Sequence, residues 1–175
     1  MFKLLPISRE SIPRAISRAE RYRLLNEPRE AESICRDILS VDPVNQEALI
    51  CLVLALTDLF LAMEATLKDV EPIITRLTSA YDRSYYAGVA EERWAKSLLV
   101  RVEERRGVAD SLHRALEHFR AAMRQAPQGN EDAILRWNTC VRLFQRFDLD
   151  AVTSGGESEG GEALIAALDD DVPAR

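Results

Sequence analysis

The amino-acid sequence predicts an all-α protein of about seven helices joined by short connections. No segment shows the strict alternation of apolar and polar residues that marks a half-buried strand. Only seven glycines and seven prolines interrupt 175 residues that are otherwise rich in helix formers. Because short connections force successive helices to pack antiparallel, we expect a stack of helical hairpins.

Prolines and capping side chains mark where the first four helices begin. A proline is tolerated in the first turn, where its missing N–H had no partner, and a cap side chain accepts a bond from an unpaired N–H. The markers of the four starts are, in order, Ser11 with Pro13, Pro28, Asn45 or Val44, and Asp69 with Pro72.

The last three helices are placed by weaker signals. Ser84 is expected to start the fifth, which runs through Trp94 until Gly107 breaks it. Asp110 then caps the sixth helix. Asn130 caps the seventh, which ends near residue 147.

The stretch 48–63 is almost entirely apolar and is broken only by Thr57 and Asp58. A membrane-spanning helix needs about 20 apolar residues, and this stretch is shorter and contains a carboxylate. A helix that is apolar on all sides is otherwise a central buried helix, which is what we expect here. The alternative is a helix with one side facing a partner.

Charge and cysteine content bound the partners and the compartment. The net charge of −6 repels phosphate backbones, so no nucleic-acid ligand is expected. The arginines between residues 14 and 23 are flanked by glutamates; we interpret them as a solvated face, with an anionic docking strip as the alternative. Cys35, Cys51 and Cys140 are odd in number and widely spaced, which favours a reducing compartment, the cytoplasm.

The composition divides the chain into a helical domain at 1–147 and an acidic tail at 148–175. Glycine, serine and glutamate dominate the beginning of this tail, as in a flexible linker. The segment 162–169 then carries three large apolar residues at positions i, i+1 and i+4, namely Leu164, Ile165 and Leu168. The tail is interpreted as a disordered end, with a short docking helix at 162–169 as the alternative.

Two segments of the chain match each other in the spacing of small, bulky and proline residues. The matching residues are Ala31, Cys35, Ile38 and Pro43 in the first copy, and Ala115, Phe119, Ala122 and Pro127 in the second. In such a pattern the small residues let two helices approach closely, the bulky residue fills the gap between hairpins, and the proline ends a helix.

This pattern resembles the tetratricopeptide repeat, whose second helix carries A-x3-F and a late proline. On the first helix, Tyr22 and the small Ala19 also match, whereas Ala15 and Arg18 stand where the repeat has Trp and Leu. The resemblance covers about 12–49 and 110–145. It implies a short TPR-like α-solenoid; a generic helical bundle with similar spacing is the alternative.

The resemblance also implies a concave surface, lined by the first helix of each pair, that binds a peptide or helix of another protein. The residues expected to line it are Ile16, Glu20, Arg23, Ile50, Leu54 and Asp58. An aromatic cluster that includes Tyr85, Tyr86 and Trp94 has the composition of an interface hot spot and equally that of a helix–helix core.

Catalytic and metal-binding patterns are not found in the sequence. His113 and His118 are five residues apart and so point to different faces of one helix, whereas the metalloprotease motif has its histidines four apart. The tail glycines lack the lysine of a phosphate loop. We therefore expect no enzyme activity, no metal and no cofactor.

The sequence thus predicts a non-enzymatic adaptor or scaffold that binds another protein. Two alternatives remain from the same observations. One is a homo-oligomeric structural module, such as a homodimer, whose apolar helix is covered by a second copy. The other is an accessory subunit of a larger enzyme complex.

Overall fold

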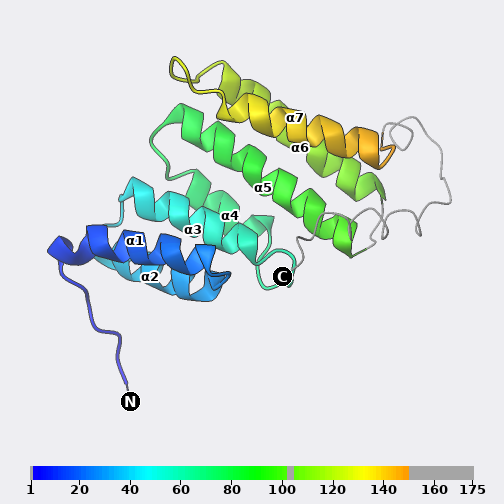
Figure 1. Cartoon of the computed structure of the whole chain (residues 1–175). Coiled ribbons are helices and arrows are strands. Elements are labelled where there is room, and N and C mark those ends of the chain that lie inside the picture. Colours follow the sequence, from blue (N-terminus) through cyan, green and yellow to red (C-terminus); the bar gives the residue numbers. More distant parts are fainter. Residues whose placement is uncertain (1, 102–104, 150–175) are drawn as a thin grey trace.

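The computed structural model describes residues 2–101 and 105–149, which form seven α-helices and no strand (Figure 1). The prediction of an all-α chain is confirmed for these residues. The elements are the 3₁₀ turn η1 (Arg9–Ser11), α1 (Ile12–Leu24), α2 (Pro28–Val41), α3 (Gln46–Asp58), α4 (Leu67–Ile74), α5 (Ala80–Val100), α6 (Arg105–Met123) and α7 (Asp132–Arg146).

Side-chain caps fix the starts of three central helices. The Asn45 side chain accepts a hydrogen bond from the Ala48 N–H at 3.0 Å, as expected for α3. At α4, Thr66 and Asp69 form a capping box in which the carboxylate accepts from the Thr66 N–H at 2.8 Å. The Ser79 side chain caps α5. Asp69 is therefore the third residue of α4 and not its cap.

Three expected boundaries in the second half are wrong. Helix α5 begins four residues before Ser84, because Ser79 supplies the cap. Gly107 and Asp110 lie inside α6, which begins at Arg105. A glycine inside a helix is unfavourable by only about 1 kcal/mol, and the burial of residues such as Leu112 on the same helix outweighs this.

The odd-numbered helices form one continuous row. Successive helices pack on each other throughout, and in addition α1 packs on α3, α3 on α5, and α5 on α7. Figure 1 shows the four helices of this odd-helix row running in the same direction, with the even-numbered helices behind them. The C-terminal ends of α1, α3, α5 and α7 therefore lie along the same edge of the molecule.

Two large apolar cores lie between the helices. The first is centred on α3, of which eight of thirteen residues are buried, as expected for a central apolar helix. The second lies between α5, α6 and α7 and includes the fully buried Leu149, two residues beyond the expected domain boundary at 147. The rest of the predicted tail, with its segment 162–169, lies outside the described residues. No described helix is both long enough and apolar enough to span a bilayer.

Candidate functional site

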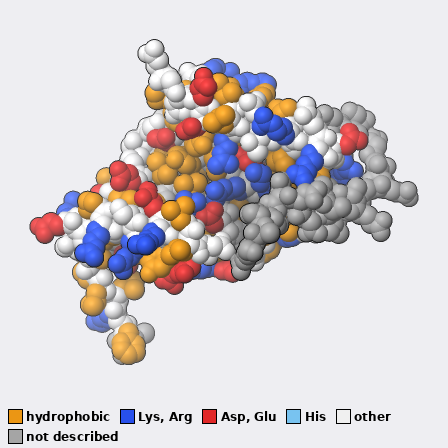
Figure 2. All heavy atoms as spheres, viewed as in Figure 1, with side chains coloured by type: hydrophobic (Ala, Val, Ile, Leu, Met, Phe, Trp, Pro, Cys, Tyr) orange, Lys and Arg blue, Asp and Glu red, His pale blue; other side chains and the backbone are white. Residues whose placement is uncertain are grey.

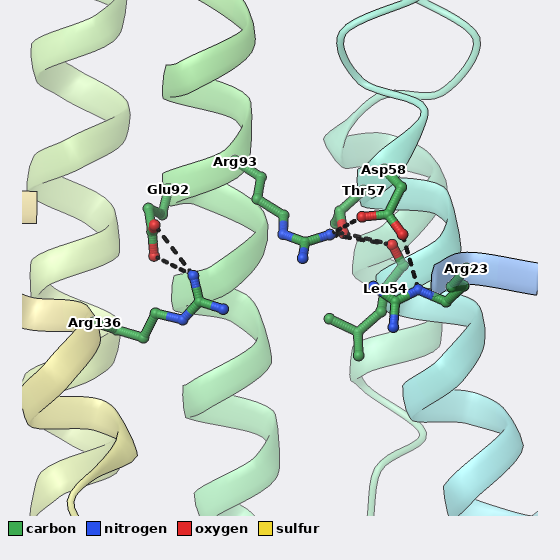
Figure 3. Close-up of polar contacts among 7 residues, drawn as sticks. All are labelled: Arg23, Leu54, Thr57, Asp58, Glu92, Arg93 and Arg136. Atoms are coloured by element: carbon green, nitrogen blue, oxygen red, sulfur yellow. Dashed lines mark hydrogen bonds and ion pairs between the residues drawn. The ribbon is translucent and has the colours of Figure 1, made fainter. Parts of the chain in front are cut away.

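The exposed face of the odd-helix row carries a strong concentration of positive charge. Figure 2, in the same view as Figure 1, shows Lys and Arg side chains gathered over α5 and α7. Part of this charge belongs to a series of ion pairs that crosses the row from α1 to α7 (Figure 3). We call this series the charge ladder; it consists of Arg23, Asp58, Arg93, Glu92 and Arg136.

Asp58 joins the first three helices of the row. Its Oδ2 accepts a hydrogen bond from Arg23 Nε of α1 at 2.8 Å, and its Oδ1 pairs with Arg93 of α5. All three side chains are about a fifth to a quarter exposed. An acid at the end of an otherwise apolar helix is tolerated here because two guanidinium groups neutralise it.

Arg93 is held by α3 through more than its ion pair. Its Nη1 also donates to the Thr57 hydroxyl at 2.8 Å and to the Leu54 carbonyl at 3.3 Å. Burial is the largest influence on this guanidinium and lowers its pKa, while Asp58 opposes that shift. Arginine nevertheless stays charged at neutral pH, so Arg93 is a fixed cation on this face.

The other half of the ladder joins α5 to α7. Glu92 is completely buried, and its Oε1 lies 3.3 Å from Arg136 Nη1 of α7 and 2.7 Å from Lys96 Nζ one turn along α5. Burial lowers the pKa of Arg136, but Glu92 and the Tyr85 hydroxyl raise it more, so the net shift is upward. Successive helical residues lie about 100° apart, which is how Glu92 reaches α7 while Arg93 reaches α3.

An apolar patch adjoins the ladder; it consists of Ile50 and Leu54 of α3 and Tyr85 and Tyr86 of α5. Ile50, Leu54 and Asp58 recur every fourth residue on one side of α3 and are half-buried. Tyr85 and Tyr86 of α5 are also half-buried, with ring centroids 5.1 Å apart. Tyr86 packs against the first core and Tyr85 against the second. Burial raises the pKa of Tyr86 to about 12.

Trp94 is mainly a packing residue. It packs against both cores, its ring meets Phe60 edge-on at 5.4 Å, and the Arg101 guanidinium lies 5.2 Å from its centroid. The structure thus gives all three predicted aromatic residues a role in packing and leaves each of them partly accessible.

A hollow of about 210 Å³ opens beside the ladder, between the C-terminal parts of α3 and α5. We call it the α3–α5 hollow; its lining consists of Thr57, Asp58, Phe60, Leu61, Arg93, Lys96, Ser97 and Val100. Leu61 is 56% exposed and Val100 is 47% exposed, so the hollow offers apolar contact beside positive charge. A larger hollow of about 550 Å³ shares Asp58 and Leu61 with it and continues toward the α1–α2 turn.

Among the residues predicted to line the surface, Arg23 and Asp58 are in direct contact, and Ile50 and Leu54 share their face of the row. Glu20 is exposed on α1. Ile16 is only 8% exposed and belongs to a small core with Ile12, Ile38 and Ala48, so it lies beneath the surface and does not line it.

Sequence reasoning missed Glu92, Arg93, Lys96 and Arg136 as members of this site. The partners of the two long-range pairs are 35 and 44 residues apart, and no local spacing reveals them. One signal was available, since a lone carboxylate at the end of an apolar helix requires a cation from another helix. The i, i+4 spacing of Glu92 and Lys96 was a second signal.

The described residues offer no arrangement suited to metal chemistry, because no group of three or more His, Cys, Asp or Glu side chains converges. His113 Nδ1 lies 2.9 Å from the Ala109 carbonyl of its own helix. The three cysteines are buried, and burial raises the pKa of Cys140 to about 12.

Comparison of this chain with protein-family models, with curated proteins and with solved structures finds no match.

Proposed function

We propose that this protein is a TPR-like helical-hairpin module that binds a peptide or helix of another protein on the face of its odd-helix row. The observation that carries the proposal is the composition of this face. An apolar patch on α3 and α5 lies directly beside the charge ladder and the α3–α5 hollow. Apolar contact area next to fixed charges is what a helix with one apolar side and charged flanks requires.

The burial of the repeat-pattern residues supports the TPR-like part of the proposal. Seven of the matching positions in the two copies are completely buried, namely Ala19, Ala31, Cys35, Ile38, Ala115, Phe119 and Ala122, and Tyr22 is half-buried. Gly88 of α5 also lies directly against the Phe119 ring of α6, so a small residue lets these two helices approach closely. Alternation of inner and outer helices along the row is the arrangement expected of stacked hairpins.

The proposed module acts as an adaptor in the cytoplasm, without a cofactor and without catalysis. Its binding energy would come from burying the apolar patch, and its specificity from the ladder, because charges at an interface select partners more than they add affinity. The fixed positions of Arg23 and Arg93 around Asp58 mean that little side-chain freedom is lost on binding.

The test is affinity capture from a lysate of the source cells with a variant of the proposed surface and a matched control. Leu61→Ser with Val100→Ser removes apolar contacts of the α3–α5 hollow at two exposed positions. The control is Arg36→Ser with Arg76→Ser, two exposed side chains that line a hollow of about 290 Å³ between α2 and α4. A partner that is captured by the wild type and the control, and lost with the first variant, supports the proposal. Equal capture by all three overturns it.

A homo-oligomeric module is the second candidate, favoured by the surface of α7. This last helix of the row exposes Ile134 by 42% and Leu135 by 62%. A second copy could cover these side chains by extending the row. Light scattering over a wide concentration range decides, since a mass that stays at one chain throughout would exclude this candidate.

A further inference from the structure

We propose that the C-terminal segment 162–171 of this chain docks in the α3–α5 hollow and occludes the interaction surface from within the same molecule. The proposal rests on the proposed function, because it names the regulation of that surface. It is carried by the charge of the face, the chemistry of the segment, and the place where the described part of the chain ends.

The face around the hollow has more positive than negative charge. Four cations, Arg23, Arg93, Lys96 and Arg136, share two carboxylates, those of Asp58 and Glu92. The surplus is unusual in a chain whose net charge is −6. Beside these cations the hollow presents the exposed apolar side chains of Leu61 and Val100. An occupant that matches both features has apolar residues on one side and carboxylates beside them.

The segment 162–171 has this composition. It reads Glu-Ala-Leu-Ile-Ala-Ala-Leu-Asp-Asp-Asp and contains four carboxylates and no cation. In a helical conformation its large apolar residues, Leu164, Ile165 and Leu168, would share one side. The three consecutive aspartates would follow that apolar side directly, at its C-terminal end.

The described part of the chain ends at residue 149, on the same edge of the molecule as the hollow, and we call this end the exit. Leu149 is completely buried, and Arg105 of α6 holds the chain just before it by donating to the Phe147 carbonyl and, at 3.1 Å, to the Asp148 carbonyl. This exit lies at the C-terminal end of α7, on the same edge as the ends of α5 and α3 that form the hollow (Figure 1).

The linker has the right length for this docking. Residues 150–161 separate the exit from the segment, and a flexible chain of this length has an end-to-end distance of ~20 Å. Neighbouring helices are ~8–10 Å apart, so two steps along the row from α7 to α3 cover ~20 Å. A segment tethered in this way has an effective concentration of ~1 mM, so even a weak contact would be populated.

The other hollows fit the segment less well. The larger hollow next to Asp58 is lined by Glu27, Glu30 and Glu64 with only one arginine, and would repel it. The hollow that contains Arg36 and Arg76 is basic and partly apolar, but it lies near the C-terminal ends of α2 and α4. Because α2 and α4 run opposite to the odd-helix row, this hollow is at the other edge of the molecule, away from the exit of the chain.

The test is zero-length cross-linking of the full chain with a carbodiimide, which joins a lysine amine to a nearby carboxylate as an amide. The chain has only three lysines, Lys3, Lys68 and Lys96, and only Lys96 lines the hollow. Lys68 is a strict control because it is exposed at the start of α4, at the same edge but in the layer behind the row. The reaction is run at high dilution of the protein, and the products are identified by mass spectrometry of tryptic peptides.

Docking predicts that cross-links from Lys96 to the carboxylates of 162–171 exceed those from Lys68 by roughly tenfold, because the tether brings the segment within reach of both lysines and only docking keeps it beside Lys96. Leu164→Ser with Ile165→Ser and Leu168→Ser should remove this excess without touching any described residue. Raising the salt to ~1 M should reduce it as well, since screening then acts within ~3 Å. Equal cross-linking of Lys68 and Lys96, or an excess that survives the triple variant, overturns the inference.

A second measurement separates this inference from the proposed function. A partner identified by capture is added to the cross-linking reaction, and the inference predicts that it suppresses the Lys96 cross-links. If a partner binds the surface but the tail never cross-links to Lys96, autoinhibition is wrong and the adaptor function stands. If the tail docks but the hollow variant captures the same proteins as the wild type, the proposed function fails while the docking remains.

Discussion

Glu92 of α5 is completely buried and lies 3.3 Å from Arg136 of α7, so the second half of the odd-helix row is joined through a carboxylate that water does not reach. The carboxylate is stable there only because cations surround it. Asp58 performs the same function between α1 and α5, but it remains about a quarter exposed. The row therefore contains one completely buried and one partly exposed carboxylate, each paired with arginines of neighbouring helices.

This difference predicts unequal effects of two neighbouring substitutions. Glu92→Gln leaves Lys96 and Arg136 facing a neutral group, and should lower the free energy of unfolding by about 3 kcal/mol. Glu91→Gln is the matched control, because Glu91 pairs with the half-exposed Arg114 and its loss should amount to less than about 1 kcal/mol. Urea denaturation followed by circular dichroism measures both. Equal losses would contradict the role assigned to the buried carboxylate.

Two glycines inside helices should respond in opposite directions to alanine. A Cβ on Gly88 would lie 2.6 Å from the Phe119 ring, which is fully buried and has little room to move. We expect Gly88→Ala to be destabilising by about 1–3 kcal/mol, despite the better helix propensity of alanine.

Gly107 of α6 is the matched control for that substitution. A Cβ on Gly107 would have Leu98 Cδ1 as its nearest neighbour, at 3.7 Å, which is an ordinary contact. Gly107→Ala should therefore be stabilising by about 0.5–1 kcal/mol. Thermal unfolding of both variants under one set of conditions tests the pair. A stabilised Gly88→Ala variant would show that α5 and α6 do not approach as closely as the structure has them.

Local sequence signals predicted the first half of the fold better than the second. Asn45 and Pro28 act through their own backbone neighbours, so a reader of the sequence can place α3 and α2 from them. Gly107 led to a wrong helix boundary for the same reason. Its local preference is against a helix, but α6 is stabilised by side chains that pack on α5 and α7.

The charge ladder shows why the candidate site could be predicted only in part. Asp58 and Arg23 were identified because their helical spacing places each on a defined face. Arg93 and Arg136 acquire their partners from helices far along the chain, and this depends on how the row is packed. Ile16 was misplaced because its helical face is also the face that packs on Ile38 of α2 and Ala48 of α3.

The capping box of α4 predicts a pH-dependent contribution to stability. Hydrogen bonds from the Thr66 backbone and side chain lower the pKa of Asp69 below its ordinary value of 3.8. A lowered folded-state pKa means that the contribution is present above the unfolded pKa and is lost as the pH falls through the folded one. Asp69→Ala should thus be destabilising by about 1 kcal/mol at neutral pH.

The corresponding control is Glu71→Ala, an exposed acid two residues further along α4. Urea titrations between neutral pH and about pH 2 should show the deficit of Asp69→Ala shrinking below about pH 4, while that of Glu71→Ala stays small throughout. A deficit of Asp69→Ala that is unchanged at about pH 2 would mean that the capping box does not depend on the ionised carboxylate of Asp69.

The three buried cysteines allow the two cores to be followed separately. Cys35 and Cys51 belong to the first core and Cys140 to the second, and none is more than 4% exposed. Burial also raises the pKa of Cys140 to about 12, so both access and ionisation oppose its reaction with a thiol reagent at about pH 8. Cys51 differs, because its hydrogen bond with Cys35 lowers its pKa.

We expect all three thiols to be protected from an aromatic disulfide reagent in the native protein and to react fully in denaturing urea. Labelling of the native protein must then pass through the opening of a core. The overpacked Gly88→Ala variant should accelerate labelling of Cys140 more than that of Cys51, because Phe119 lies in the second core. Peptide mapping after timed labelling gives the rate at each cysteine. Equal acceleration at both sites would indicate that the cores open together, as one cooperative unit.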